Sequence, residues 1–406
     1  MPISNTYVVL ASGVQARGTC LNPYNNTMLL VDSSNGLVRQ YDLSTYSRIE
    51  PYCYLSNTTP TGIAMVSSTS AMVCFSGQSS VDLVELSTGH RVTIATPNST
   101  PSQASTVAKG QQIAGDPTNK YALILTTQNL VTLINCNNPT LPSAINTAVS
   151  LRSGSTPSTV ILKEPGRFLI GSSYGEIYEM DLTGNPVKRM VLSNENSIGT
   201  PISVMDPRIV GMSYDNNMLL VTTEVGIIYL IDWSSLTILR TYGANQSNQG
   251  VLISESASGV CLGVVAPVTS QDKVVMEFDF TVSPLSVGKN PLHLNSGTQI
   301  IDVGIHPTTG RGWVIQQTTT TGATTTTTIF FFDVSVRATT TRTVTSANSG
   351  QFRLIIVDRY DNSTYLDTLA GLSPATYRVP SGKNIREIVK IGDGATALFS
   401  LTYDTT

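Results

Sequence analysis

The chain has 406 residues, enough for two or three average domains or for one large closed β architecture. Only 13% of the residues are charged and the formal net charge is −3, with an isoelectric point near 5.7. This composition offers no basic surplus to hold a phosphate backbone, and no apolar run approaches the roughly 20 residues that span a bilayer. We therefore expect neither nucleic acid binding nor membrane insertion.

The N-terminus, Met1–Thr6, has neither the basic nor the apolar region of a secretory signal, which indicates synthesis in the cytosol. The cysteines are odd in number, widely spaced and mostly embedded in apolar, strand-like runs, so we expect them to be reduced. They are Cys20, Cys53, Cys74, Cys136 and Cys261.

A short apolar run that ends in an acidic residue or Asn recurs seven times along the chain. Its ends are Asp42, Glu85, Asn135, Asp181, Asp232, Asp279 and Asp333. Successive ends are about 43 to 54 residues apart, which is the length of a four-stranded propeller blade. The spacing predicts an all-β protein with a seven-bladed β-propeller over residues 1–348.

Each repeat unit contains further strand patterns around its acidic end. In the second unit, apolar runs at Ile63–Met65 and Met72–Phe75 precede Glu85, and a fourth run follows at His90–Ala95. Turn residues, often Asn or Asp before Pro, separate the first two runs. The next hairpin carries a glycine, which provides the positive φ that such turns require. These glycines are Gly36, Gly175 and Gly226.

The unit resembles the WD40-like and quinoprotein-like propeller repeats in its Asp-Pro turn, its Gly hairpin and its ending of the type Tyr41-Asp42-Leu43. The resemblance covers about 330 of the 406 residues. The Trp-Asp and Gly-His signatures of WD40 repeats are missing, and Trp233 follows its acidic residue instead of preceding it. The resemblance therefore implies the architecture and not a subfamily.

The candidates for chemistry in this sequence favour structural roles. Recurring carboxylates could converge on a central channel for glycoside hydrolysis, but a residue placed alike in nearly every blade favours accepting backbone N–H bonds at a strand end. The histidines His90, His293 and His306 are isolated from other metal ligands, and His306 stands where other units have a turn Asn or Asp. No nucleotide or hydrolase motif is present. We predict no catalytic residue, no cofactor and no metal.

The aromatic residues leave a second possibility open. We expect the two tryptophans, Trp233 and Trp313, to pack in the core because each lies in a strand pattern. Four tyrosines could line a carbohydrate-binding surface or pack within strands, and the sequence does not separate these roles. They are Tyr174, Tyr178, Tyr214 and Tyr229.

In the seventh unit the hairpin is enlarged, with threonine runs at 318–321 and 324–328 on either side of Gly322-Ala323. Threonine favours strands, so we predict a ribbon that stands out from the rim. A two-stranded ribbon alone is marginal in water, which leaves a tolerated low-complexity loop or a contact with another subunit or partner. The candidate contact residues are Thr318, Thr320, Gly322, Thr325 and Thr327.

The period breaks after Ser349, where apolar runs at Phe352–Val357 and Ala395–Tyr403 enclose a Tyr377-Arg378-Val379-Pro380 segment. They predict a small all-β domain over residues 349–406. This order resembles the carboxypeptidase-regulatory-like or transthyretin-like, Ig-like β-sandwich, and similar modules close tail and appendage proteins of tailed bacteriophages. Arg353 and Arg359 are further candidate contact residues.

These features lead us to expect a non-catalytic structural component of a tailed bacteriophage virion, at the tail tip, baseplate or tail appendage, with host attachment as a further role. We expect it to work in a multi-subunit assembly with other virion proteins and with a host surface receptor or glycan. We expect it in the virion after synthesis in the host bacterial cytoplasm. The alternatives are a glycan-binding or glycan-degrading propeller protein and a cytoplasmic scaffold of a cell.

Overall fold

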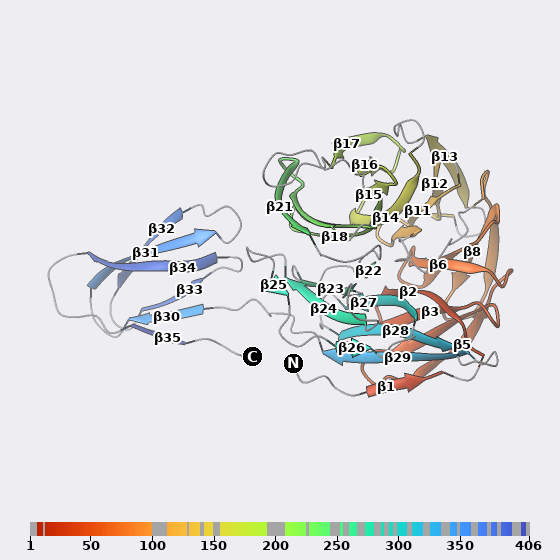
Figure 1. The fold of residues 1–406 in the computed structure, drawn as a ribbon, viewed down its shortest axis with the longest axis horizontal. Coiled ribbons are helices and arrows are strands. Elements are labelled where there is room, and N and C mark those ends of the chain that lie inside the picture. The colour runs from red at the N-terminus through yellow and green to blue at the C-terminus, as the bar shows by residue number, and fades with distance from the viewer. Residues whose placement is uncertain are drawn as a thin grey trace. The chain divides into compact units, whose positions relative to one another are not determined.

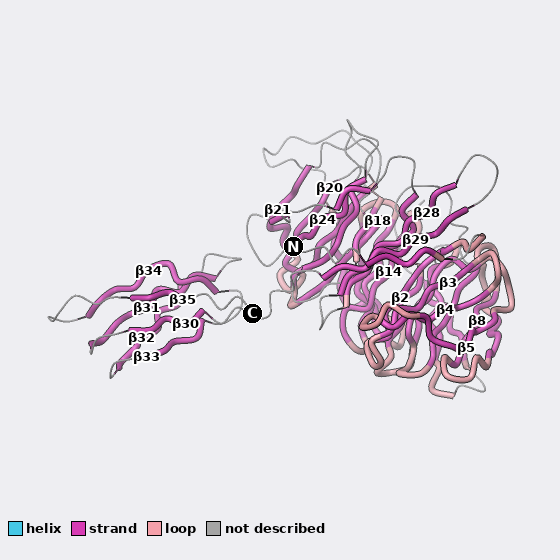
Figure 2. Tube along the Cα trace, turned by 90° about the horizontal axis from the view of Figure 1, so that it is seen from below, coloured by secondary structure: helices cyan, strands magenta, loops and turns pink. Residues whose placement is uncertain are grey.

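The computed structural model of the chain shows strands and loops in its described part (Figure 2). The residues that the structure describes are 6–10, 13–99, 112–127, 130–138, 142–148, 155–192, 208–224, 227–243, 252–254, 260–265, 273–279, 286–287, 292–294, 299–306, 311–319, 325–333, 342–346, 350–358, 364–371, 375–379, 383–391 and 399–402. Within them, no helix is long and apolar enough to cross a membrane.

Six four-stranded antiparallel sheets form the blades of a β-propeller (Figure 1). Five of them use four consecutive strands, and the sixth takes its last strand from the N-terminus. The strands are β2 (Ala16–Asn22), β3 (Thr27–Asp32), β4 (Leu37–Asp42), β5 (Arg48–Tyr54); β6 (Pro60–Met65), β7 (Ser70–Phe75), β8 (Ser80–Glu85), β9 (Arg91–Ala95); β10 (Ile113–Asp116), β11 (Tyr121–Leu125), β12 (Leu130–Asn135), β13 (Ser143–Ala148); β14 (Pro157–Glu164), β15 (Arg167–Ser172), β16 (Glu176–Asp181), β17 (Pro186–Val191); β18 (Ile209–Asp215), β19 (Met218–Thr223), β20 (Ile227–Asp232), β21 (Thr237–Gly243); and β27 (Gln299–Ile305), β28 (Arg311–Thr319), β29 (Thr325–Asp333), β1 (Thr6–Val9).

A further sheet has the order β22-β23-β24-β25, with β26 paired to β24. Its strands are β22 (Leu252–Ile253), β23 (Val260–Val265), β24 (Lys273–Asp279), β25 (Ser286–Val287) and β26 (Leu292–Leu294). Strand β22 contacts both β18 and β27, the first strands of two blades.

The repeat predicted from the sequence is confirmed at its strand ends. Each of the seven acidic or Asn positions is the last residue of a strand, in β4, β8, β12, β16, β20, β24 and β29. Gly36 and Gly175 have φ of 60° and 71°, as the hairpin chemistry predicts. Gly226 lies outside the described residues. The period therefore locates the third strand of every unit correctly.

The cores of the propeller lie between neighbouring blades. Every side chain of β3 and of β19 is buried. In β9, at the outside of its blade, every second residue is exposed. One cluster joins Leu29 and Val31 of β3 with Val73 and Phe75 of the next blade. Both faces of each middle strand are covered, which explains their continuous apolar runs.

The ring is closed by the N-terminal strand. Strand β1 pairs antiparallel with β29, with Thr6 opposite Phe331 and Val9 opposite Thr328. Leu10 continues the pairing, since its N–H donates to the Thr327 carbonyl at 2.9 Å. The outer strand of this blade therefore comes from the opposite end of the propeller sequence.

The chain divides into two compact units, one of Met1–Glu277 with Gly288–Val334 and one of Phe278–Val287 with Ser335–Thr406. The second unit contains two three-stranded antiparallel sheets, of order β33-β30-β35 and β32-β31-β34. Their strands are β30 (Arg342–Ser346), β31 (Gly350–Asp358), β32 (Thr364–Gly371), β33 (Ala375–Val379), β34 (Lys383–Ile391) and β35 (Phe399–Thr402). Strand β30 thus pairs within this unit although it precedes residue 349, where the sequence predicts the second domain to begin.

Candidate functional site

The acidic ends of the repeat hold turns. Oδ1 of Asp42 accepts hydrogen bonds from the backbone N–H groups two and three residues ahead, at 2.6 and 2.9 Å. Asp181 and Asp232 accept the equivalent bond from the residue two ahead at 2.9 and 2.8 Å, and Asn135 does so at 2.9 Å. The interpretation of these residues as acceptors at a strand end is confirmed, and none of them lines the axial cavity described below.

At one repeat position, Glu85, the described side chain makes a different contact. The Glu85 carboxylate accepts hydrogen bonds from the hydroxyls of Thr69 and Ser70, at 3.2 and 2.8 Å, and so ties the end of β8 to the turn before β7. The side chains of Asp279 and Asp333 lie outside the described residues.

The turn carboxylates predict an acid-sensitive stability. Slight burial would raise the pKa of Asp42, Asp181 and Asp232, but hydrogen bonds to each carboxylate outweigh it and lower the pKa below 3.8. A lowered folded pKa adds stability above the unfolded value, and this is lost as pH falls through the folded pKa. We expect urea unfolding to show a fall in stability between about pH 5 and pH 3, small because solvent screens these groups.

The matched variant for this prediction is the triple substitution D42N/D181N/D232N. Asparagine keeps the Oδ1 acceptor without the charge, as Asn135 does naturally at the same position. The triple variant should lose less stability than the wild type over the same pH range. Equal losses would contradict the role assigned to these carboxylates.

Neighbouring blades are joined by bonds at matching repeat positions. Gln40, two residues before one acidic end, donates from Nε2 to the Leu86 carbonyl of the next blade at 2.9 Å. Glu179 occupies the same position in its blade, and its Oε2 accepts a hydrogen bond of 2.6 Å from Nε1 of Trp233 in the next blade. Leu86 and Trp233 each directly follow an acidic end. The buried polar groups at these positions therefore fasten blade to blade.

The aromatic residues divide between core and surface. Trp233 and Trp313 are 1% and 2% exposed, so their predicted core packing is confirmed. Tyr178 and Tyr229 are also buried in core clusters, which favours strand packing over a carbohydrate surface for these two. Tyr174 is 37% exposed.

His306 directly follows β27, at the turn position predicted for it. It is buried, and its backbone N–H donates to the Arg311 carbonyl at 2.7 Å. Burial lowers the pKa of its imidazole. In the described part of the chain, no group of three or more His, Cys, Asp or Glu side chains could hold a metal ion.

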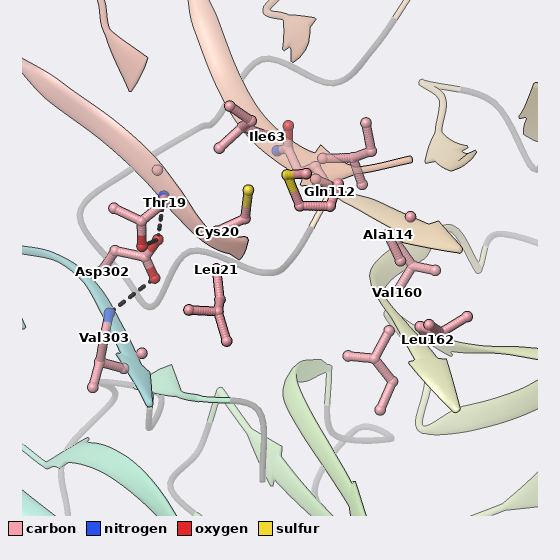
Figure 3. A pocket seen from close by; sticks show the side chains of 18 of the residues that line it. Thr19, Cys20, Leu21, Ile63, Gln112, Ala114, Val160, Leu162, Asp302 and Val303 are labelled. Carbon is pink, nitrogen blue, oxygen red and sulfur yellow. Dashed lines mark hydrogen bonds between the residues drawn. The ribbon is translucent and has the colours of Figure 1, made fainter. Parts of the chain in front are cut away.

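The first strands of the blades surround an axial cavity of about 350 Å³. Most of its described wall comes from β2, β6, β10, β14, β18 and β27, and each of these is the first strand of its blade in chain order. Apolar side chains dominate it, among them Leu21, Ile63, Val160 and Leu162 (Figure 3). Cavities that hold small ligands are typically of this size and character.

The main polar feature of the described cavity wall is a group of hydrogen bonds that joins the first and last blades. Oδ2 of Asp302 accepts bonds from the backbone N–H and the hydroxyl of Thr19, at 2.6 and 2.8 Å, and Oδ1 accepts the Val303 N–H at 2.9 Å (Figure 3). Trp313 Nε1 donates to the same Thr19 hydroxyl at 3.1 Å. Among the described lining residues Asp302 is the one carboxylate. A pair of acids, as glycoside hydrolysis requires, is not assembled from them.

The threonine hairpin of the last blade is in contact with the N-terminal segment of the same chain. Thr318 pairs with Thr326 across β28 and β29, as the two threonine runs predict. The N-terminal segment lies along the outer edge of β29, where Gly13 N–H donates to the Thr325 carbonyl at 3.1 Å. The support for the ribbon is thus intramolecular at its base.

The structure corrects the role predicted for Thr327. Its side chain is fully buried, its hydroxyl donates to the Val14 carbonyl at 2.6 Å, and Gln317 Nε2 donates to it at 3.2 Å. It shares a strand face with the buried Ile329 and Phe331, so the two-residue period of a strand could have shown this. Thr327 is therefore a closure residue and no longer a candidate contact.

Removing that hydroxyl should weaken ring closure. Thr327→Val keeps the shape but leaves the Val14 carbonyl and the Gln317 amide without this buried partner. We expect a loss of about 1–3 kcal/mol in the free energy of unfolding, measured with urea. Thr325→Val, at a partly exposed position of the same strand, should stay within about 0.5 kcal/mol of the wild type. Equal losses in both variants would contradict the closure role.

The other candidate contact residues remain predictions. Thr318 and Thr325 are partly exposed, and Arg353 lies in β31. Thr320, Gly322 and Arg359 lie outside the described residues.

Comparison with known proteins gives the fold and no activity. No protein family model matches the chain, and no curated protein matches its sequence. Among solved structures, the β-propeller domain of Cps50 (Swd1) from Myceliophteria thermophila is similar, with a TM-score of 0.58 and 13% identity over 82% of this chain and 100% of that chain. The shared architecture is a β-propeller. At this identity the likeness shows the fold alone.

Proposed function

We propose that the chain is a non-catalytic structural component of a tailed bacteriophage virion, placed at the tail tip, baseplate or a tail appendage. The proposal that the protein is non-catalytic is supported by the structural contacts that its polar side chains make. The repeated acids hold turns, Glu179 fastens two blades, and Asp302 is tied to Thr19 in the cavity wall. A frame built in this way suits rigid display and docking more than reaction chemistry.

The placement in a virion rests on the sequence resemblance of the C-terminal region to modules of phage tail proteins and on the low charge of the chain. We further propose that the sheet of β22–β26 is a seventh blade, because β22 contacts the first strands of the blades on either side. We also propose that the two C-terminal sheets form the small sandwich that the sequence resembles.

In this proposal the partners are other virion proteins in a multi-subunit assembly, with a host surface receptor or glycan as a further target. Binding would use loops and exposed strand edges through shape complementarity, without nucleic acid and without membrane insertion. The protein would be made in the host bacterial cytoplasm and would end in the virion.

A glycan-binding or glycan-degrading protein is the second candidate, and exposed tyrosines favour it. Tyr54 is 66% exposed, and Tyr24 is 55% exposed where it lines the axial cavity. Aromatic rings of this kind offer apolar faces on which sugar rings can stack.

Fractionation tests the proposal. Phage particles purified on a density gradient from cells that produce the chain should contain it at a constant ratio to the major particle proteins, by quantitative mass spectrometry. Its absence from particles would contradict the structural role. Purified chain incubated with host-surface polysaccharide should release no oligosaccharides, and release would establish the degrading alternative instead.

A further inference from the structure

We propose that the axial cavity is a binding site for one small, uncharged and mainly apolar molecule. This goes beyond the proposed structural role, because a docking platform needs no ligand on its axis.

The cavity is larger than packing defects normally are. Protein interiors rarely contain voids much larger than a water molecule, whereas this cavity has a volume of about 350 Å³. Its described wall is drawn from six blades, so the cavity lies on the axis of the ring and not within one sheet. A cavity of this volume matches the range of sites that enclose small ligands.

The wall selects for apolar surface. Leu21, Ile63, Ile113, Val160 and Leu162 contribute aliphatic side chains from four different blades. A charged ligand would lose its hydration against this wall without adequate replacement.

Charged residues do not change that selection. Oδ1 and Oδ2 of Asp302 accept hydrogen bonds from Val303 and Thr19. Arg17, the one basic residue among the described lining residues, donates to Ser33 Oγ at 3.3 Å and to Gln15 Oε1 at 3.4 Å. The described wall thus carries one basic and one acidic side chain, both hydrogen-bonded within the protein, and no net charge that would select a charged ligand.

Cys20 provides a reporter inside the same cavity. It lines the wall and is partly exposed (Figure 3), whereas Cys53, Cys74 and Cys136 are buried. Burial raises the pKa of those three thiols to about 11, 11 and 12, which makes them unreactive near neutral pH. A small electrophile such as N-ethylmaleimide should therefore modify Cys20 faster than these three, and a ligand in the cavity should protect it.

The test uses the full chain and N-phenyl-1-naphthylamine, an uncharged aromatic probe, beside 8-anilino-1-naphthalenesulfonate, which has the same rings and a negative charge. We expect saturable fluorescence binding of the uncharged amine with one site per chain, at least tenfold tighter than that of the sulfonate. Bound amine should slow modification of Cys20 at least fivefold, by peptide mass spectrometry. Non-saturable binding, or unchanged modification of Cys20 at saturation, overturns the proposal, and these readouts need no variant.

Two variants locate the site. Leu162→Trp places a larger side chain in the cavity and should weaken binding of the amine at least tenfold, whereas Val187→Trp places the same side chain at a position 47% exposed on β17 and should leave binding unchanged. Equal binding by Leu162→Trp and wild type, with both folded by circular dichroism, overturns the site.

Discussion

Asp32→Ala is expected to lower the free energy of unfolding by about 3–5 kcal/mol, because it leaves the Arg39 guanidinium buried without its counter-ion. The Asp32 side chain is fully buried, and its Oδ2 accepts bonds from Nε and Nη2 of Arg39 at 3.0 and 2.8 Å. Its Oδ1 accepts the N–H and hydroxyl of Ser34 at 3.1 and 2.6 Å. Burial opposes ionisation, but the bonds from Ser34, Asn35 and Arg39 lower the pKa of Asp32, so the carboxylate is charged at neutral pH. Urea unfolding monitored by circular dichroism measures the loss.

A double-mutant cycle separates the interaction energy of the Asp32–Arg39 pair from the other effects of each substitution. Arg39→Met alone should also destabilise, while Asp32→Ala/Arg39→Met should cost less than the sum of the single substitutions because neither charge is then left alone. Asp42→Ala provides the surface control and should cost no more than about 1.5 kcal/mol. Additive losses in the cycle would contradict an interacting buried pair.

Gly115→Ala should be the most damaging small substitution on the inner strands. A Cβ at Gly115 would overlap the backbone carbonyl oxygen of Met65 in the neighbouring blade, and a backbone atom cannot rotate away as a side chain can. Overpacking usually costs about 1–3 kcal/mol, and a clash between two backbones should reach the upper end or exceed it. The thermal unfolding midpoint of the purified variant measures the effect.

Gly18→Ala is the matched control for this substitution. Gly18 lies on β2, the first strand of another blade, and a Cβ there would meet its nearest atoms at 3.6 Å, which is ordinary contact. We expect its unfolding midpoint to be close to that of the wild type. A similar fall in the unfolding midpoint of both variants would contradict the claim that the close approach of the inner strands requires glycine at position 115.

The strand ends could be predicted because each depends on chemistry within a few residues. Asp42, Asp181 and Asp232 each bind the backbone two residues ahead, so the signal is local and repeats with the blade. Ring closure could not be predicted in this way. Thr6 pairs with Phe331, and no local pattern encodes a partner so far along the chain.

The same limit explains the internal polar contacts that the sequence did not show. Asp32 precedes Ser33-Ser34-Asn35-Gly36 and has the features of an ordinary turn residue. Its pairing with Arg39 depends on the register of β3 against β4, which places Leu30 opposite Arg39. The axial cavity is still less local, because its lining residues converge only when the blades form a ring.

Charged side chains of the described propeller are used inside its frame. Buried carboxylates of the frame pair with neighbouring strands, and the repeated ones hold turns. We expect docking of other macromolecules to use its loops, its exposed tyrosines and its C-terminal unit.

Imaging of intact particles tests the proposed structural role most directly. Tailed particles from cells that produce the chain with an epitope tag should bind gold-labelled antibody at the tail tip, baseplate or a tail appendage, and averaged electron cryomicroscopy images should show a propeller-shaped ring at the labelled position. Particles that carry no label, with all of the tagged protein in the particle-free supernatant, would contradict the proposal.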